Sequence, residues 1–181
     1  MATSIGRRIC VVGTSGSGKT YVAEALARLL GLRYISCDSL IWRAHSMQVP
    51  RDEQLEAFDA ATRDGEWTFD GNLGPSAEDQ LVRSRCDTVI WLDLSRWQVI
   101  WSITLRTFWR ATTRRPMWHG NVERWGQVFS RDSMILWAWR THGQQRARYT
   151  RLFREQHDSG RTLVRLTSRA AVDAWLRGLE G

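Results

Sequence analysis

No stretch of this 181-residue chain approaches the roughly 18 consecutive apolar residues that a membrane span needs. The N-terminus has no apolar segment ahead of its first expected strand, so no signal peptide is predicted. Cysteine is scarce: Cys10, Cys37 and Cys86 are odd in number and have no metal-ligand spacing. We therefore expect one cytoplasmic domain over residues 1–181, with reduced buried thiols, no zinc site and no membrane partner.

Lysine is almost missing as well. Of the 26 Lys and Arg residues only Lys19 is a lysine, and it lies in the segment Gly13-Thr14-Ser15-Gly16-Ser17-Gly18-Lys19-Thr20. A compact ammonium reaches between phosphate groups more easily than a broad, planar guanidinium does. Because the spacing also matches the phosphate-binding loop G-x-x-x-x-G-K-[ST], we interpret the segment as a nucleotide phosphate site.

The residues on both sides of this loop fit that interpretation. Arg8–Val12 is a short β-branched run typical of a buried parallel strand, and residues 19–30 carry valine and leucine at helical spacing. Glycines let successive backbone N–H groups converge on one point, and the helix N-terminus adds partial positive charge. We expect Lys19 to bridge the β- and γ-phosphates of ATP, and Thr20 to ligate Mg²⁺. The residues expected to bind the nucleotide are Gly13, Ser15, Gly16, Ser17, Gly18, Lys19 and Thr20.

Strands and helices are expected to alternate along the rest of the chain. Further strands are predicted at 32–37, 66–70, 87–94 and 161–167. Helices are predicted after Pro50, from Ser76, from Ser95 to about Trp109, from Ser130 to about Gln156, and through Trp175. This alternation predicts an α/β fold with a parallel sheet, helices on both faces, and ligands beyond the carboxyl ends of the strands.

Three aspartates end or follow expected strands and should therefore lie beside the phosphate loop. Asp70 is the best candidate to hold a water on Mg²⁺, with an Asx turn as the alternative. Asp38 is expected to accept a proton from a substrate hydroxyl, although a helix-capping role fits about equally well. Asp93 is the weaker candidate because the strand pattern continues past it.

Arginines gather in the second half of the chain. Arg106 and Arg110 lie four residues apart on one face of an expected helix, and Arg140 lies on the next helix. Phosphoryl transfer spreads negative charge over equatorial oxygens, so these three are expected to stabilise the transferring group. Solvated charge is the simpler interpretation of Arg114, Arg115 and the downstream run Arg146, Arg148, Arg151 and Arg154.

The net charge of +7 is compatible with two kinds of partner. A nucleic-acid backbone attracts arginine-rich surfaces by counterion release, and phosphoryl-transfer enzymes also gather arginines around polyanionic substrates. The eleven tryptophans are interpreted mostly as core packing, with one or two at most as a platform for a flat or apolar substrate. None of the four histidines has a partner acid at motif spacing, and none is expected to be catalytic.

Together these features resemble the adenylate kinase-like group of phosphate-loop proteins and, within it, the short bacterial topology modulation (FlaR-type) proteins. Five segments carry this resemblance, and the last of these segments is the most distinctive. They are Val-Gly-Thr-Ser-Gly-Ser-Gly-Lys-Thr at 12–20, Cys-Asp-Ser-Leu-Ile-Trp at 37–42, Trp-Thr-Phe-Asp-Gly-Asn at 67–72, Val-Ile-Trp-Leu-Asp-Leu at 89–94 and Ser-Arg-Asp-Ser-Met-Ile-Leu-Trp-Ala-Trp-Arg-Thr-His at 130–142.

The resemblance implies a P-loop NTPase fold with five parallel strands in the order 2-3-1-4-5 and a lid between residues 111 and 128. It also implies that Asp70 supports Mg²⁺ and that the three arginines named above grip phosphates. Adenylate kinases follow this Asp-Gly pair with Phe-Pro-Arg, whereas this chain has Asn72-Leu73-Gly74. The arginine that would grip a monophosphate acceptor is therefore missing, and Trp42 and Asn72 are expected to shape a different pocket, as in metabolite kinases.

We expect a Mg²⁺-dependent small-molecule or nucleotide kinase that transfers the γ-phosphoryl group of ATP to an acceptor that the sequence leaves open. The alternative is a nucleic-acid-associated ATPase or regulator, although no helix-turn-helix signature supports it. Nucleotide binding without turnover is a third possibility. The expected catalytic residues are Lys19, Asp38, Arg106, Arg110 and Arg140, and the expected metal ligands are Thr20 and Asp70.

Overall fold

The structure is a computed structural model of the 181-residue chain. It describes residues 5–43, 47–113, 134–155 and 160–180, apart from the side chains at 107, 110–113, 134 and 135. None of the helices in this described part is both long and apolar enough to cross a bilayer.

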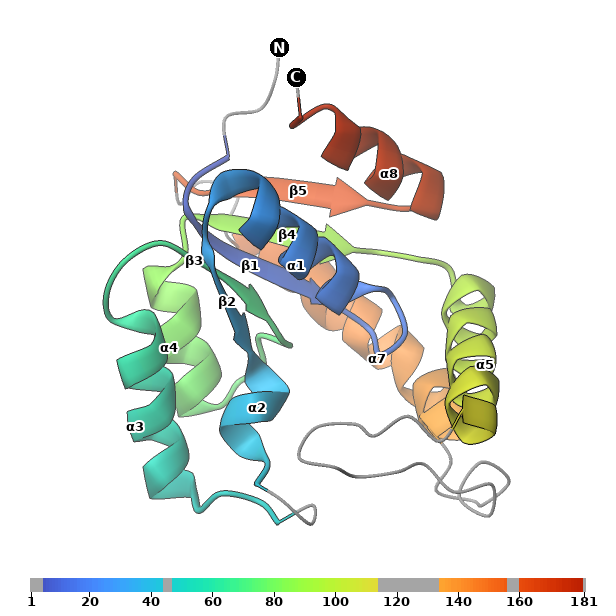
Figure 1. The fold of residues 1–181 in the computed structure, drawn as a ribbon, viewed down its shortest axis with the longest axis horizontal. Coiled ribbons are helices and arrows are strands. Elements are labelled where there is room, and N and C mark those ends of the chain that lie inside the picture. Colours follow the sequence, from blue (N-terminus) through green and yellow to red (C-terminus); the bar gives the residue numbers. More distant parts are fainter. Residues whose placement is uncertain (1–4, 44–46, 114–133, 156–159, 181) are drawn as a thin grey trace.

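Five parallel strands form one sheet in the order β2-β3-β1-β4-β5, which confirms the predicted fold class and strand order (Figure 1). The central strand β1 pairs with β3 on one side, where Val11 is opposite Asp70, and with β4 on the other. Every crossover is long because parallel neighbours cannot be joined by a hairpin. The strands are β1 (Arg8–Gly13), β2 (Arg33–Ser36), β3 (Trp67–Asp70), β4 (Thr88–Leu92) and β5 (Thr162–Leu166).

Helices cover both faces of the sheet, as the alternating pattern predicts (Figure 1). The helices are α1 (Lys19–Leu30), α2 (Cys37–Ile41), α3 (Arg51–Thr62), α4 (Ala77–Arg85), α5 (Arg96–Thr113), α7 (Met134–Glu155) and α8 (Arg169–Arg177). Ser76 and Ser168 cap α4 and α8 through hydrogen bonds from the backbone N–H groups of Asp79 and Ala171. These caps satisfy backbone donors that the first helical turn leaves unpaired.

Alternate residues of the central strands enter two separate cores. Ile9 and Val11 point to the face covered by α1 and α8, whereas Cys10 and Val12 point to the face covered by α3, α4 and α7. Side chains of a strand alternate between faces, so a strand buried on both sides must be apolar at every position. This explains why Arg8–Gly13 carries no alternation of polar and apolar residues.

Two of the element boundaries that differ from the sequence prediction bear on the site. The second strand ends at Ser36 because α2 begins at Cys37, so Asp38 lies in the first turn of a short helix and not at a strand end. Helix α5 continues to Thr113 and not to Trp109. Residues 111–113 of the expected lid therefore belong to α5, and residues 114–128 lie outside the described part of the chain.

The expectation that most tryptophans pack in the core is wrong. Trp67 and Trp91 are buried, at 0% and 2% exposure, and both lie on strands. Most of the other described tryptophans lie on helices and face solvent, while Trp175 packs against the core beneath α8. The exposed ones are Trp42, Trp97, Trp101, Trp109, Trp137 and Trp139.

Candidate active site

The predicted phosphate loop joins the end of β1 to the start of α1 at the carboxyl edge of the sheet. Gly16 and Gly18 have φ angles of 81° and 93°, which residues with a side chain adopt at a cost. A Cβ on Gly16 would also lie 2.4 Å from the Cγ1 atom of Ile103 on α5. The N-terminus of α1 has no side-chain cap and no acid in its first turn, so its N–H groups stay available to a phosphate.

Lys19 folds back over this loop. Its Nζ donates to the carbonyl oxygens of Gly13 at 3.0 Å and Thr14 at 3.1 Å. Burial lowers the pKa of the ammonium, the negative charges of Asp70 and Asp38 oppose that shift, and Arg106 adds to it. A buried cation held only by neutral carbonyls gains most from an anion beside it, which is what a phosphate group would supply.

Thr20 and Asp70 meet at the mouth of the loop. The Thr20 hydroxyl donates to Oδ2 of Asp70 at 2.6 Å, and the Tyr34 hydroxyl donates to the same oxygen at 3.2 Å. Burial and the Asp70 carboxylate raise the pKa of Tyr34, so that phenol stays a donor. The aspartate thus lies directly beside the first turn of α1, and an Asx turn is not needed to explain it.

This pair of oxygens fits a magnesium ion. Mg²⁺ prefers hard oxygen ligands and keeps several waters, so one hydroxyl and one carboxylate beside a phosphate are sufficient. Across the residues that the structure describes, no group of three or more His, Cys, Asp or Glu side chains comes together. Among the described residues, the Thr20 and Asp70 oxygens therefore suit a Mg²⁺ ion held jointly with nucleotide phosphates.

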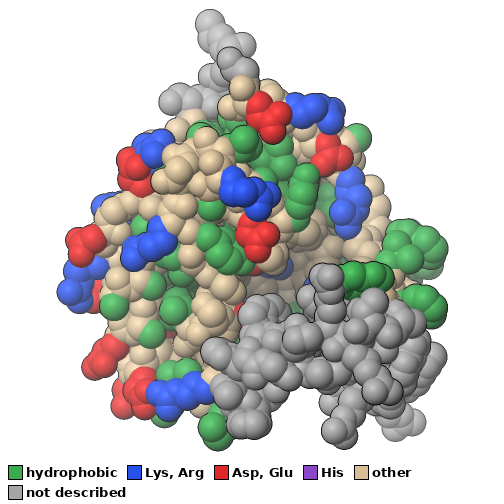
Figure 2. Space-filling view, in the orientation of Figure 1, with side chains coloured by type: hydrophobic (Ala, Val, Ile, Leu, Met, Phe, Trp, Pro, Cys, Tyr) green, Lys and Arg blue, Asp and Glu red, His purple; other side chains and the backbone are tan. Residues whose placement is uncertain are grey.

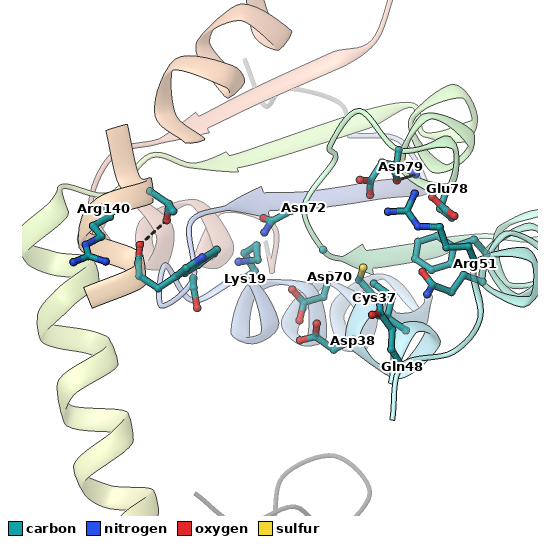
Figure 3. A pocket seen from close by; sticks show the side chains of 18 residues that line it. Lys19, Cys37, Asp38, Gln48, Arg51, Asp70, Asn72, Glu78, Asp79 and Arg140 are labelled. Atoms are coloured by element: carbon teal, nitrogen blue, oxygen red, sulfur yellow. Dashed lines mark hydrogen bonds between the residues drawn. The ribbon is translucent and has the colours of Figure 1, made fainter. Parts of the chain in front are cut away.

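Asp38 lies across the cleft from Lys19 on α2 (Figure 3). Burial raises the pKa of its carboxyl group, the negative charge of Asp70 adds to this, and Lys19 and Arg106 oppose it. The N-terminal cap position of α2 is Ser36, and no side-chain hydrogen bond caps this helix. The capping role considered from the sequence is thus not what the carboxylate does, and it remains free to act in the cleft.

Lys19, Asp38 and Asp70 line one cleft of about 760 Å³ (Figure 3). This volume is typical of a site for a small organic molecule. The half of the cleft away from the loop is built by α2, α3 and the start of α4. Its lining includes polar residues that the sequence analysis did not assign to a site, namely Cys37, Gln48, Arg51, Gln54, Glu78 and Asp79.

Arg51 is the most informative of these additions. The sequence places it in the first turn of α3, where a charged residue is expected to face solvent, and the structure places that turn beside the cleft. Arg51 and Asn72 both line the cleft, Arg51 at the end away from Lys19. No local sequence signal could find it, because the contact depends on how α3 packs against the sheet.

The three arginines predicted to stabilise the transferring phosphoryl group differ in where the structure places them. Arg140 lines the cleft from α7, with its side chain exposed (Figure 3). Arg106 is half-buried on α5, and its charge contributes to the pKa shifts of both Lys19 and Asp38, so it lies on the side of α5 that faces the loop. The side chain of Arg110 lies outside the described residues, as do Arg114 and Arg115.

Asp93 does not line the cleft. Its buried carboxylate accepts from Arg146 Nε at 2.8 Å and from Arg165 Nη2 at 2.5 Å. The idea of three aspartates around the loop therefore needs correction, since only Asp38 and Asp70 lie there. Arg146 was interpreted from the sequence as a solvated charge, but its ion pair with Asp93 connects α7 to the end of β4.

Tyr149 anchors α7 to the edge of the cleft. Its hydroxyl donates to Asn72 Oδ1 at 2.8 Å and accepts from Arg148 Nη2 at 3.0 Å. Burial raises the pKa of Tyr149 to about 12, so the phenol remains protonated. Arg148 is thereby engaged in a hydrogen bond, which the sequence interpretation as solvated charge missed. His142 is buried and its Nε2 lies 3.0 Å from the Leu94 carbonyl oxygen, consistent with a structural residue.

Comparisons with known proteins agree on the architecture. No family model matches the chain, and no curated protein matches it either, so the resemblance to topology modulation proteins stays a prediction. Among solved structures, a gluconokinase from Sinorhizobium meliloti 1021 has 17% identity and a TM-score of 0.54, over 94% of this chain and 90% of its own.

Two further kinases give the same result. A shikimate kinase from Acinetobacter baumannii in complex with shikimate has 16% identity and a TM-score of 0.53, over 95% of this chain and 90% of its own. A sugar kinase from Janibacter sp. HTCC2649 has 12% identity and a TM-score of 0.51, over 94% and 90%. At these identities the similarity concerns the fold. The chain has the α/β fold that these P-loop kinases share, with its glycine-rich loop after the first strand.

Proposed function

We propose that this protein is a small-molecule kinase that uses ATP and Mg²⁺. One observation carries the proposal: the 2.6 Å contact between Thr20 and Asp70, next to an uncapped glycine loop that holds Lys19. It unites the three parts that phosphoryl transfer needs, namely a cradle for phosphates, a mobile cation and a hard metal site. The similar solved structures are kinases of small hydroxylated molecules, which supports the same reaction class.

In this proposal the acceptor hydroxyl oxygen attacks the γ-phosphorus of ATP while the bond to the β–γ bridging oxygen breaks, and ADP leaves. Lys19 moves from the loop carbonyls onto the β- and γ-phosphates, since phosphate oxygens carry a negative charge that the two carbonyl oxygens lack. Asp38 accepts the proton that the hydroxyl loses. Arg106 and Arg140 stabilise the negative charge on the transferring group, and Arg110 has the same proposed role.

Thr20 and Asp70 would hold the metal. When bound, Mg²⁺ neutralises charge on the β- and γ-phosphate oxygens. Thr20 contributes its hydroxyl oxygen, and Asp70 contributes a carboxylate that already lies at hydrogen-bond distance from it. Tyr34 keeps the Asp70 side chain oriented through its own hydrogen bond.

The acceptor would occupy the half of the cleft lined by Gln48, Arg51, Gln54 and Glu78. Gln54 is buried at the wall of the cleft, and its Nε2 donates to the Val49 carbonyl oxygen, which holds the amide in place. Amides, a guanidinium and a carboxylate together can position a hydroxylated molecule by hydrogen bonds. No arginine follows Asn72 in the sequence, and this favours a metabolite over a nucleoside monophosphate as the acceptor.

A phosphoryl-transfer screen tests the proposal. Purified protein is incubated with ATP, Mg²⁺ and pools of sugars, sugar acids, polyols and nucleoside monophosphates, and new phosphate esters are detected by ³¹P NMR. We expect one class of hydroxylated metabolite to give a product, and Lys19→Ala to reduce that rate at least about 100-fold, the range for loss of a transition-state cation.

One control variant and two alternative outcomes make the screen decisive. Arg28→Ala changes an exposed cation on α1 outside the cleft and should leave the rate within about twofold of wild type, as surface substitutions usually do. ATP hydrolysis that DNA stimulates, with no acceptor found, would instead support the nucleic-acid-associated ATPase. Binding of ATP without any turnover would identify a nucleotide-binding protein that is not an enzyme.

A further inference from the structure

Helix α5 is apolar on two opposite sides. Val99 and Ile103 are fully buried against the body of the protein. On the other side, four large side chains follow one another at spacings of four, four and three residues and are exposed by 71%, 66%, 51% and 60%, namely Trp97, Trp101, Leu105 and Phe108. A surface helix normally needs one apolar stripe, so a second stripe that stays this exposed offers an apolar surface to a partner.

The exposed stripe continues onto α7. The ring of Trp139 meets that of Trp97 edge to face, with centroids 5.2 Å apart, and the guanidinium of Arg96 lies 5.0 Å from the centroid of the Trp139 ring. We call Trp97, Trp101, Leu105, Phe108 and Trp139 the aromatic face. Figure 2 shows hydrophobic side chains gathered at the edge of the molecule that α5 forms.

Basic side chains lie beside this face. Helix α5 carries no acid, and its Arg96 lies against the Trp139 ring, whereas Arg106, Arg140 and Arg146 are directed to the phosphate loop, the cleft or Asp93 and do not add to the charge of the face. Arg169 adds another cation beside α5 through its hydrogen bond to Ser102 Oγ. Two copies of the chain meeting through this face would bring these charges together, whereas an anionic partner would be attracted.

We propose that the aromatic face binds the surface of a membrane that contains anionic lipids. Tryptophan is enriched at membrane interfaces, and a helix side that combines Trp, Phe and Leu with nearby arginines can lie in the interface plane. Leu105 and Phe108 offer no hydrogen bond to a base or a phosphate, so they suit acyl chains better than nucleic acid. Binding would be peripheral, and it is independent of the proposed kinase activity, because none of the five side chains lines the cleft.

Vesicle co-sedimentation of the full-length protein tests this proposal. We expect the protein to sediment with phosphatidylglycerol–phosphatidylcholine vesicles at 50 mM salt, to bind pure phosphatidylcholine vesicles at least about tenfold more weakly, and to lose affinity as salt rises. The double variant Trp97→Ser/Trp101→Ser should lower the affinity at least about tenfold. Both side chains are mostly exposed, so the variant should fold.

A matched control and the rival partners complete the test. Tyr21→Ser/Leu55→Ser removes two other exposed large side chains, 57% and 40% exposed, and should bind vesicles like wild type. No sedimentation with anionic vesicles, equal binding to neutral vesicles, or equal loss in the control variant would overturn the proposal. So would a stable dimer or a DNA complex that forms without lipid and is lost in Trp97→Ser/Trp101→Ser.

Discussion

Asp38 is a partly buried carboxylate. Its burial suits the proposed role in proton transfer but lowers the stability of the folded protein. Because burial raises its pKa, the folded protein binds this proton more tightly than the unfolded chain does. The folded state therefore loses stability as pH rises from the ordinary pKa of aspartate through the raised one. A residue that costs stability in the free protein is typical of a functional site.

Asp38→Asn should separate these two effects. We expect kcat to fall about 10²- to 10³-fold, as for loss of a general base, while the KM for ATP changes less than about threefold. The Tm of the nucleotide-free protein should rise at a pH above the raised pKa, and that gain should shrink as the pH falls toward and below the ordinary pKa of aspartate, about 3.9, because the wild-type carboxyl is then protonated in both states. Asp52→Asn, an exposed carboxylate outside the cleft, should change neither quantity. An unchanged kcat in Asp38→Asn would remove the residue from the catalytic set.

Thr20 gives the sharpest test of the metal site. Thr20→Val keeps the shape of the side chain but removes the oxygen that contacts Asp70 at 2.6 Å. We expect the Mg²⁺ concentration for half-maximal turnover to rise at least about tenfold, because Mg²⁺ depends on few protein oxygens. Thr20→Ser retains the oxygen and should stay within about threefold of wild type. Equal Mg²⁺ dependence in the valine and serine variants would place the metal elsewhere.

At the scale of elements, the phosphate loop depends on α5 for its shape. Gly16 touches Ile103, and its left-handed φ angle turns the chain toward α1. Helix α5 thereby fixes the loop from one side while it exposes its aromatic face on the other. The position of α5 thus links the nucleotide site to the surface proposed to bind lipid.

Gly16→Ala should disrupt this contact. Its methyl group would lie 2.4 Å from Ile103 Cγ1 at an unfavourable φ of 81°, so we expect a loss of about 2–4 kcal/mol in the free energy of unfolding. The affinity for ATP should fall at least about tenfold. Gly31→Ala, with φ of 65° and nothing within 4 Å of its added Cβ, should cost only about 1–2 kcal/mol and leave ATP binding intact. Equal ATP affinity in both variants would refute the tight packing of the loop.

At the scale of the whole molecule, one buried carboxylate connects distant parts of the chain. Asp93 follows β4, and its partners are Arg146 on α7 and Arg165 on β5. Arg165 also stacks 4.7 Å from the centroid of the Trp91 ring. This cluster fixes the helix that carries Arg140 and Tyr149 relative to the sheet.

Asp93→Ala should therefore destabilise the fold. We expect the free energy of unfolding to fall by about 2–3 kcal/mol, because two charge-assisted hydrogen bonds are lost while the half-exposed arginines regain water. Urea denaturation measures this change. Asp59→Ala removes an acid that also has two arginine partners but lies nearer the surface, and its loss should be clearly smaller. A smaller loss for Asp93 than for Asp59 would contradict the assigned role of the cluster.

The sequence predicted those features that local residues determine. The loop and the Thr20–Asp70 pair follow from contiguous motifs, and the parallel sheet follows from the alternation of strands and helices, whereas the strand order was implied only by the resemblance to adenylate kinase-like proteins. Partners far apart in the chain could not be predicted, since Arg51 reaches the cleft through helix packing and Asp93 finds Arg165 across 72 residues. The exposure of Trp97 and Trp101 was missed because helical spacing alone does not tell which apolar stripe faces the core.

The central claim is that the glycine loop and Lys19 hold the phosphates of ATP, and calorimetric titration of ATP with Mg²⁺ tests it most directly. We predict saturable binding to the wild type, and at least about 30-fold weaker binding to Lys19→Ala, a loss of about 2 kcal/mol. The Tm of Lys19→Ala should equal or exceed that of wild type, because burial disfavours the Lys19 charge. Absence of ATP binding by the wild type, or equal affinity in Lys19→Ala, would contradict the claim.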